Sequence, residues 1–593
     1  MKFPLSMLAG ADGVRPGWRP VKERLIMNGA ALLGFGLAVF AVAFVAYGGY
    51  LKRVFGIDPK RPCPSHTLRD DIDYCPTPMP VLFGHHFASI AGAGPIVGPV
   101  LAAYLGWGPA ILWIVLGCIL IGAMHDFAAM FLSVRNRGRS IAYVIQNELG
   151  YAGRQIFLLF CLAALLLVVA VFTLQVAQGF LATPSVATAS ILFILMAPIF
   201  GVAIGRKIVT LTEGSIVFVP LLFVCVWLGT VIPLDLTAIL GDPKLALLVW
   251  ILILLYYAAC ASILPVWVLL QPRDYLNSYL LYAMMLIGIA GIFCAHPHLE
   301  APMFAEAIPG KPGVFPLLFV TIACGACSGF HALVASGTSS KQIDREAHIL
   351  PVGYGSMLVE GVLAIIAIIS ICYLPLNDFN ALTAKLGKSV PPAGAFAAGL
   401  AHFAQTLHIP YTLGLTFISL AISAFMLTSL DTATRLCRFV WQELVLPPVP
   451  ADGDSKTTAA QPTDGKATCA CPVRAILASR WISTLLVVVL AGWLALSGEG
   501  AAIWPVFGSS NQLLAALTLL SVTLWLMRTK RPVLFALLPM LFMLTISIWA
   551  LVELIISRSG ILVAVSVGLL VLALMLVALG ARKMLALRHQ RNG

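Results

Sequence analysis

The chain has 593 residues, of which 60% are hydrophobic and 10% are charged, and its formal net charge is +12. Its mean hydropathy is +0.97. So much apolar surface cannot be buried in a water-soluble core, so the composition excludes soluble enzymes and predicts a polytopic integral membrane protein in a lipid bilayer. The basic residues cluster in short segments beside apolar runs, where topology signals lie, and no nucleic-acid partner is expected.

Apolar runs predict about fifteen membrane spans, counted at roughly 20 residues for each crossing. The runs lie near residues 29–51, 81–105, 107–132, 154–178, 188–205, 213–232, 246–270, 278–294, 314–337, 351–374, 411–437, 475–497, 502–527, 532–552 and 560–580. Between 374 and 411 there is little hydrophobic periodicity, which predicts a loop. We expect four parts: an N-terminal segment with one extra span and a cytoplasmic loop (1–80), a core (81–440), a flexible cytoplasmic linker (441–474) and a C-terminal group of four spans (475–593).

The Lys and Arg residues of short loops predict the orientation of these spans. One parity places nearly all basic loops in the cytoplasm: those with Arg135/Arg137/Arg139, Arg206/Lys207, Arg273, Lys341/Arg345 and Arg528/Lys530/Arg531, and the C-terminus. The alternate loops near 179–187, 233–245 and 295–313 are almost free of basic residues. An odd number of spans then puts the N-terminus outside, and no removable signal peptide is expected.

The run 81–105 is long enough to cross a bilayer but is rich in residues that weaken a helix. Its stretch Phe83–Pro99 contains four glycines, two prolines and the adjacent histidines His85 and His86. Unpaired backbone at membrane depth is tolerated only where protein or a water-filled cavity satisfies it. The stretch therefore predicts an interrupted helix that lines a binding site.

A second interrupted helix is predicted at 246–270, where Tyr256–Pro265 combines small residues with a proline. It follows the first by five spans and runs in the opposite direction. Two interrupted helices at corresponding positions of two oppositely oriented halves indicate an inverted-repeat transporter with its site near the membrane midplane.

Ionisable side chains inside a membrane are costly and need a reason. The candidates near span centres are His85, His86, His125, Asp126, His331, Glu360 and Asp431, and no Lys or Arg is clearly central. Carboxylates and histidines without fixed cations suit coupling to protons or cations. The alternative for Glu360 and Asp431 is hydrogen bonding between helices.

We predict two sets of site residues. The substrate cavity is assigned to Gly84, His85, His86, Ser89, Gly92, Gly94, Tyr257, Ser262 and His331. Coupling is assigned to Asp126, Glu360, Asp431, Ser336 and Thr338, with the histidines of the substrate set as further candidates. For the two hydroxyl residues, helix-end capping is an equally good interpretation.

Two other classes of protein were weighed. An intramembrane metal-dependent enzyme would use His85, His86, His125 and Asp126, but neither pair has the i, i+4 spacing that places two ligands on one helix face. The Cys324-x-x-Cys327 pair has no second pair, which favours packing over zinc. A nutrient sensor would need a soluble output domain, and the sequence shows none. No metal or cofactor is expected.

Four long motifs resemble the carbon starvation protein A family, and the resemblance covers most of the chain. They are Phe83–Phe87 with Ala91–Pro95, Leu264–Trp267 with Pro272–Leu276, Ile322–Leu333 with Ser336–Thr338, and Trp504–Ala516. The chain differs from the family in having one span fewer at the N-terminus and in the loops near 375–410 and 443–474.

The resemblance implies an all-α, LeuT-like inverted repeat of five plus five helices with about five additional helices. It also implies an importer of the amino acid/polyamine/cation superfamily in the bacterial inner membrane, used in carbon starvation. The implied substrate is pyruvate or a short peptide, with a proton or sodium as coupling ion, and both pairs of alternatives stay open. Without a central cation, a substrate carboxylate would be bound by backbone N–H groups around Gly92–Gly94, aided by His85 or His86.

Overall fold

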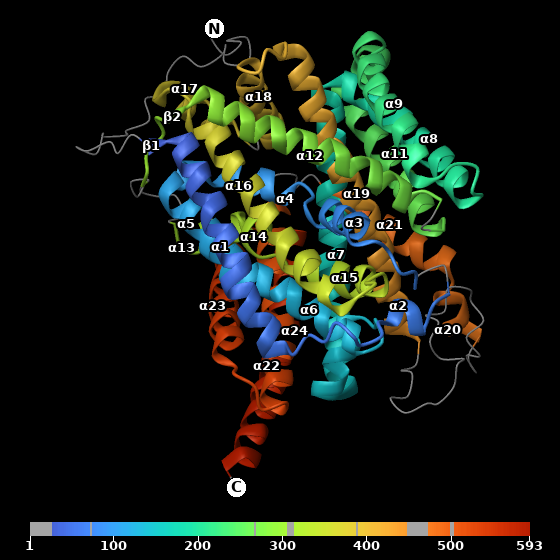
Figure 1. The fold of residues 1–593 in the computed structure, drawn as a ribbon, viewed down its shortest axis with the longest axis vertical. Coiled ribbons are helices and arrows are strands. Elements are labelled where there is room, and N and C mark those ends of the chain that lie inside the picture. Colours follow the sequence, from blue (N-terminus) through green and yellow to red (C-terminus); the bar gives the residue numbers. More distant parts are fainter. Residues whose placement is uncertain are drawn as a thin grey trace.

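The computed structural model describes residues 27–70, 74–265, 268–304, 314–386, 390–446, 472–497 and 503–592. In these ranges the regular secondary structure consists of helices and of two short strands, β1 (Met27–Asn28) and β2 (His298–Leu299), which pair antiparallel. Twelve helices are long and apolar enough to cross a bilayer, and one bent pair of helices makes a thirteenth candidate. The predicted all-α polytopic fold is confirmed (Figure 1).

The longer helices follow one another through the whole chain. In order they are α1 (Gly29–Phe55), α3 (Met79–Ile90), α4 (Gly94–Ala102), α5 (Trp107–Gly117), α6 (Ala123–Arg135), α7 (Ile141–Ala182), α8 (Pro184–Gly205), α9 (Leu211–Val231), α11 (Pro243–Ile263), α12 (Leu270–Ala295), α13 (Val314–Thr321), α15 (Gly329–Gly337), α16 (Ser356–Cys372), α17 (Leu376–Lys385), α18 (Pro392–Gln405), α19 (Tyr411–Val445), α21 (Arg480–Ala495), α22 (Ile503–Arg528), α23 (Leu534–Ser557) and α24 (Ile561–Asn592).

Two of the fifteen predicted spans are not among the thirteen candidates that the described residues contain. Residues 314–337 do not form a continuous span, because the chain there is divided into α13, a single turn α14 (Ala323–Ala326) and α15. The run 475–497 contains α21, whose 16 residues are fewer than a straight crossing needs. The predicted linker lies mostly outside the described residues.

The first interrupted helix is confirmed. Helix α3 ends at Ile90 and α4 begins at Gly94, and the pair is bent by 43°. Pro95 occupies the first turn of α4, where its missing N–H costs no intrahelical bond. The chain therefore begins a new helix at Gly94 instead of continuing α3.

The second interruption is at a different place from the predicted one. Helix α11 is unbroken, because alanine is the best helix former and Pro265 lies just beyond the helix end at Ile263. The interruption lies instead at Cys327 and Ser328, whose backbone is extended between α14 and α15. The sequence predicts a continuous span through this Cys-Ser-Gly stretch, and that prediction is wrong.

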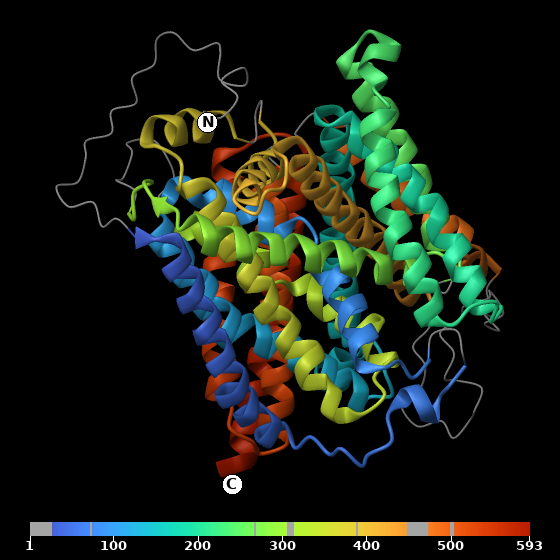
Figure 2. The ribbon, with the colours of Figure 1, turned by 45° about the horizontal axis from the view of Figure 1, so that its top comes forward.

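The two interrupted helices cross the core in opposite directions. Helix α4 packs against α13 and α14, whereas α3 packs against α15, so the first half of one lies beside the second half of the other. Helices α8 and α9 form a hairpin at one edge of the molecule (Figure 2). Without this hairpin, five crossings precede the second interrupted helix: α3 with α4, α5 with α6, α7, α11 and α12. An inverted five-plus-five repeat requires this number.

The predicted loop between 374 and 411 is wrong, because the structure has α17 and α18 there. Helix α18 buries Phe396, Leu400 and Phe403 against α12, α19 and α4. Its polar residues are too few to show an amphipathic period, so tertiary contact stabilises it more than its own pattern suggests.

Several of the basic loops meet at one end of the bundle. Arg135 is 2.5 Å from the Glu346 carboxylate and donates to the Gly56 carbonyl at 2.8 Å. Arg528 lies 3.0 Å from the Glu148 carboxylate. The start of α1 lies at the opposite end, where β1 pairs with β2 of the 295–313 loop. Which of the two ends faces the cytoplasm stays a prediction.

Candidate functional site

The break between α3 and α4 packs directly against two other helices. A Cβ atom added to Gly92 would lie 2.3 Å from the Ser429 Oγ of α19, and one added to Gly94 would lie 2.1 Å from the Cys324 Cβ of α14. Contacts this short require the neighbour to move, so both positions favour glycine, Gly94 more strongly because the Cys324 Cβ cannot rotate away. The first break therefore touches the start of the second.

The second break is held by one amide side chain from α22. The Asn511 carbonyl oxygen accepts from the Phe330 backbone N–H at 2.9 Å, and its NH₂ group donates to the Ser328 Oγ at 3.0 Å and to the Cys324 Sγ at 3.1 Å. Asn511 is buried. It satisfies backbone that the interruption leaves unpaired, as buried polar groups require.

A line of buried titratable groups lies beside the breaks and joins three helices. The Asp126 carboxylate of α6 contacts the His125 Nδ1 at 2.7 Å and the His331 Nδ1 of α15 at 2.8 Å. On the other side of this imidazole, His331 Nε2 lies 3.5 Å from the Glu360 carboxylate of α16. All four side chains are fully buried. The structure thus brings together three predicted residues, Asp126, His331 and Glu360, hereafter the relay line.

A second charged group contains an arginine that the sequence analysis placed in a cytoplasmic loop. Arg273, near the start of α12, is fully buried and forms ion pairs with Asp431 of α19 and, at 3.0 Å, with Asp274. The Tyr257 hydroxyl donates to Asp431 at 2.7 Å and accepts from Arg273. The expectation that the membrane interior holds no fixed cation is wrong, because these carboxylates compensate the guanidinium. We call Arg273, Asp274, Asp431 and Tyr257 the arginine cluster.

The adjacent histidines of α3 face different groups. His85 Nδ1 lies 3.2 Å from the Asp274 carboxylate of the arginine cluster, whereas His86 Nδ1 lies 2.8 Å from the Ser339 Oγ, beyond the end of α15. Successive helical residues point about 100° apart, so one short helix reaches both neighbours. Helix α3 therefore connects two groups of polar side chains.

The other predicted residues have local partners. Ser89 Oγ donates to the His85 carbonyl, and Gly84 lies against Ser278 of α12. Ser262 is buried beside Arg438.

Ser336 Oγ accepts from the Ile141 backbone N–H at the start of α7, and Thr338 Oγ1 donates to the Val334 carbonyl. The contacts of these two residues are those of helix-end capping.

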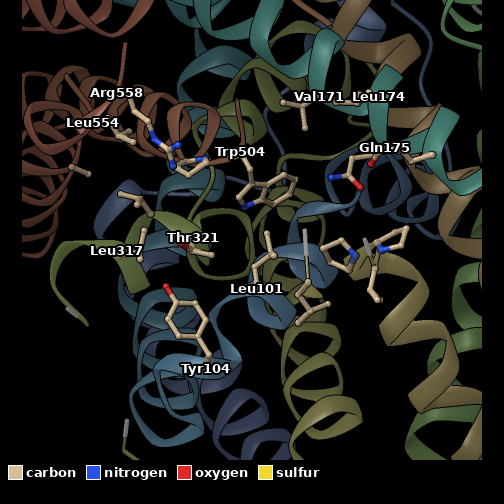
Figure 3. A pocket seen from close by; sticks show the side chains of 18 of the residues that line it. Leu101, Tyr104, Val171, Leu174, Gln175, Leu317, Thr321, Trp504, Leu554 and Arg558 are labelled. Carbon is tan, nitrogen blue, oxygen red and sulfur yellow. The ribbon is translucent and has the colours of Figure 1, made fainter. Parts of the chain in front are cut away.

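A cavity of about 860 Å³ opens at the end of the bundle opposite the basic loops. It is lined by α4, α7, α13, α22 and α23, and Figure 3 shows Tyr104, Gln175, Trp504 and Arg558 around it. A volume of this size is typical of small-molecule sites. Thr321, at the end of α13, also lines it and lies two residues before α14.

Three aromatic rings lie between this cavity and the first break. Trp504 lines the cavity and packs on Phe507 at 5.3 Å between ring centroids, and Phe507 packs on Phe172 at 6.0 Å. A Cβ at Gly92 would lie 3.3 Å from the Phe172 ring. The rings thus separate the cavity from the Gly92 backbone in this conformation.

The described residues contain no group of three or more His, Cys, Asp or Glu side chains placed to hold a metal ion. His85 and His86 have separate partners, and the His125 Nδ1 atom lies 2.7 Å from the Asp126 carboxylate. The geometry therefore offers the metalloenzyme alternative no support.

Three functional candidates were missed from sequence. Arg273 and Asp274 were missed because a basic residue near the end of an apolar run resembles an ordinary topology signal. Asn511 was missed because its role depends on α15, which is 181 residues away from it in sequence at Phe330. A polar Ser509-Ser510-Asn511-Gln512 stretch within an apolar span was the available signal.

Two antiparallel interrupted helices, with titratable side chains buried beside the breaks and a cavity leading toward them, are the arrangement of a membrane transporter. The family model described as carbon starvation protein CstA matches residues 28–391 and 384–550. The chain belongs to this family, and its members are transporters and not enzymes.

The names of individual relatives state different substrates. The chain is 33% identical to the peptide transporter CstA of Campylobacter jejuni, over 82% of this chain and 74% of that protein. It is 31% identical to the pyruvate/proton symporter BtsT of Escherichia coli, over 87% of this chain and 80% of that protein. Among solved structures, it is similar to a manganese transporter of Eremococcus coleocola, with a TM-score of 0.49 and 12% identity, over 88% of this chain and 99% of that one.

Proposed function

We propose that the protein imports either a small carboxylate, namely pyruvate, or a short peptide across the bacterial inner membrane. It does so by alternating access and is driven by protons. The observation that carries this proposal is the relay line, buried beside the second break. Ionisable groups inside a membrane protein mark substrate and ion paths by default. The family relationship, with one relative named a pyruvate/proton symporter, supports the same class of transport.

The substrate site is proposed at the two breaks. Helices α4 and α15 each begin there, and the N-terminus of a helix carries a partial positive charge that favours carboxylates, although Asn511 already holds the Phe330 N–H of α15. Gly92 and Gly94 place backbone without side chains at the first of these N-termini, and His86 lies on the preceding helix. The substrate would enter from the 860 Å³ cavity after the Trp504, Phe507 and Phe172 rings move apart.

The relay line is proposed to carry the coupling proton. His331 lies between two carboxylates, so two negative charges share one imidazole. A proton bound at His331 or Glu360 reduces this excess negative charge inside the protein, and its loss restores it. Because His331 is on α15, directly after the second break, its protonation state acts on the helix that shapes the substrate site.

The test is uptake of radiolabelled pyruvate and of a labelled dipeptide into proteoliposomes with an imposed inward proton or sodium gradient. We expect uphill accumulation of one substrate driven by the proton gradient. Glu360→Gln should abolish accumulation but keep exchange of internal for external substrate, because exchange needs no net proton movement. Glu300→Gln, an exposed glutamate outside the relay line, is the matched control.

Two results would overturn the proposal. The first is accumulation driven by sodium alone. The second is absence of any uptake or exchange of either substrate by protein that elutes as a single folded species.

A further inference from the structure

The arginine cluster is not used by the transport cycle proposed above, yet it is buried in the same core. Its one guanidinium faces two carboxylates, so the cluster has an excess of one negative charge when His85 is neutral. Arg273, Asp274 and Asp431 each have an exposed fraction of 0%. An uncompensated charge in such surroundings is strongly unfavourable.

The cluster also has polar atoms without a hydrogen-bond partner among the described residues. They include Asp274 Oδ2, Asp431 Oδ1 and both ring nitrogens of His85. Asp274 Oδ2 and His85 Nδ1 lie only 3.2 Å apart. A carboxylate oxygen and a ring nitrogen at this distance are satisfied together when the ring nitrogen carries a proton, because the N–H then donates to the oxygen.

His85 is also the member of this group that a proton can reach. Its exposed fraction is 7%, whereas those of the three charged residues are zero. A proton on His85 would bring the net charge of the group to zero and satisfy the facing oxygen of Asp274. No other single protonation does both without breaking an ion pair of Arg273.

We propose that His85 and Asp274 form a second proton-binding site, separate from the relay line, so that each transport cycle carries a second proton. This inference rests on the proposed proton-driven transport. The two sites share no residue and lie on different helices: the relay line is on α6, α15 and α16, and the second site is on α3 and α12.

Every element packed against α3 carries titratable or charged side chains. They are Arg273, Asp274 and Tyr282 on α12, Asp431, Arg435 and Arg438 on α19, His331 on α15, Glu360 on α16, Tyr354 on the turn before α16, and His86 on α3 itself. Of these, Asp274 is the group in direct contact with His85, and Arg273 and Asp431 set its charge balance.

The site lies where the cycle needs motion. Helix α3 is the first half of the interrupted span, and His85 joins it to α12. The proton binds a ring nitrogen on one side of the membrane and leaves that nitrogen for water on the other. When it leaves, the excess charge returns and Asp274 loses its donor, which favours separation and hydration of α3 and α12.

The experiment measures proton-to-substrate stoichiometry in proteoliposomes from the pH gradient at which net substrate flux is zero. We expect His85→Gln and Asp274→Asn each to lower the stoichiometry roughly twofold, from two protons to one, because one of two linked protonation sites is lost. Any uphill transport that remains in either variant is then driven through the relay line alone. His298→Gln, an exposed histidine on β2, is the matched control and should keep the wild-type value.

Each outcome separates this inference from the proposed function. A wild-type stoichiometry of one, or an unchanged stoichiometry in both variants, overturns the second site and leaves proton-driven transport intact. Absence of any proton-driven transport in the wild type overturns the proposed function itself. If neither variant transports, proton release measured with a dye in lightly buffered detergent solution after a pH jump decides: an unchanged number of protons released by His85→Gln overturns the second site.

Discussion

The two interruptions in the core solve the same problem by different means. At the first, between α3 and α4, glycine backbone lies so close to Ser429 and Cys324 that no side chain fits. At the second, between α14 and α15, Gly329 packs just as closely against α22, and the Asn511 amide of α22 adds hydrogen bonds. Backbone that a helix leaves unpaired is thus protected by close packing in one case and by close packing together with a polar side chain in the other.

The different contacts at the two breaks imply different ways in which each break opens for substrate. A break closed by packing opens only when whole helices separate, because Gly92 and Gly94 lie against α19 and α14. At the second break the hydrogen bonds of Asn511 can in addition be exchanged at one residue. We therefore expect glycine substitutions at the first break to act through steric overlap, and substitutions of Asn511 and Ser328 at the second to act through lost hydrogen bonds.

The largest effect is expected from Gly94→Ala. The new Cβ would lie 2.1 Å from the Cys324 Cβ, which is fixed to backbone and cannot rotate away. Overpacking of this kind costs about 1–3 kcal/mol and at times more, so we expect most of the protein to be lost as aggregate in detergent size-exclusion chromatography. Cys324→Gly should restore part of the folded peak. Gly568→Ala, which meets open space on α24, is the control.

Asn511→Leu should have the next largest effect. It leaves the buried Phe330 N–H without its acceptor, and a buried unsatisfied group costs about 1–3 kcal/mol. The expected result is a lower melting temperature of the detergent-solubilised protein. The melting temperature is measured from the fluorescence of the folded peak that remains after heating. Asn377→Leu, at an exposed position in the first turn of α17, should melt like wild type. Equal melting of both variants would show that the amide does not hold the second break.

Gly92→Ala should be milder than Gly94→Ala, although both glycines belong to the same break. The nearest atom is the Ser429 Oγ at 2.3 Å, and a hydroxyl can rotate, whereas the Ser429 Cβ would be at 3.0 Å. We expect a cost of about 1–2 kcal/mol by the same overpacking argument, relieved in the Gly92→Ala, Ser429→Ala double variant. A double variant no more stable than Gly92→Ala would contradict the assigned contact.

Ser328→Ala should have the smallest effect. It removes the hydroxyl that accepts from Asn511 at 3.0 Å but leaves the Phe330 N–H bond intact. The net contribution of such a hydrogen bond is about 1 kcal/mol, which predicts a small shift in the same melting assay. A loss as large as that of Asn511→Leu would mean that Ser328, and not Phe330, is the group that Asn511 stabilises.

The first break is predictable from the sequence because its signal is local. Gly92, Gly94 and Pro95 weaken a helix wherever they stand, so their spacing predicts an interruption without knowledge of the neighbours. The same reasoning failed at Tyr256–Pro265, where small residues are compatible with a helix and only the proline ends it. The second break was hidden because Cys327 and Ser328 are not helix breakers by themselves.

The domain boundaries stay a prediction. Helix α22, which they place in the C-terminal group of spans, packs directly against α14 and α15 and supplies Asn511 to the second break. The predicted site residues also stay predictions, but the structure sorts them by contact. Asp126, His331 and Glu360 form one line, and Asp431 and Tyr257 belong to another cluster with Arg273.

Composition and hydropathy by themselves determined that the chain is a polytopic membrane protein, because the amount of apolar surface does not depend on how the helices pack. The residue pattern also indicated several of the buried ionisable residues, among them Asp126, His331 and Glu360, but not Arg273 or Asp274. Only the tertiary structure decided which of these charges are partners. A carboxylate such as Asp431 is costly alone and stable beside Arg273, and that contact joins residues 158 positions apart. Pairing depends on the distance between helices, which no local sequence pattern records.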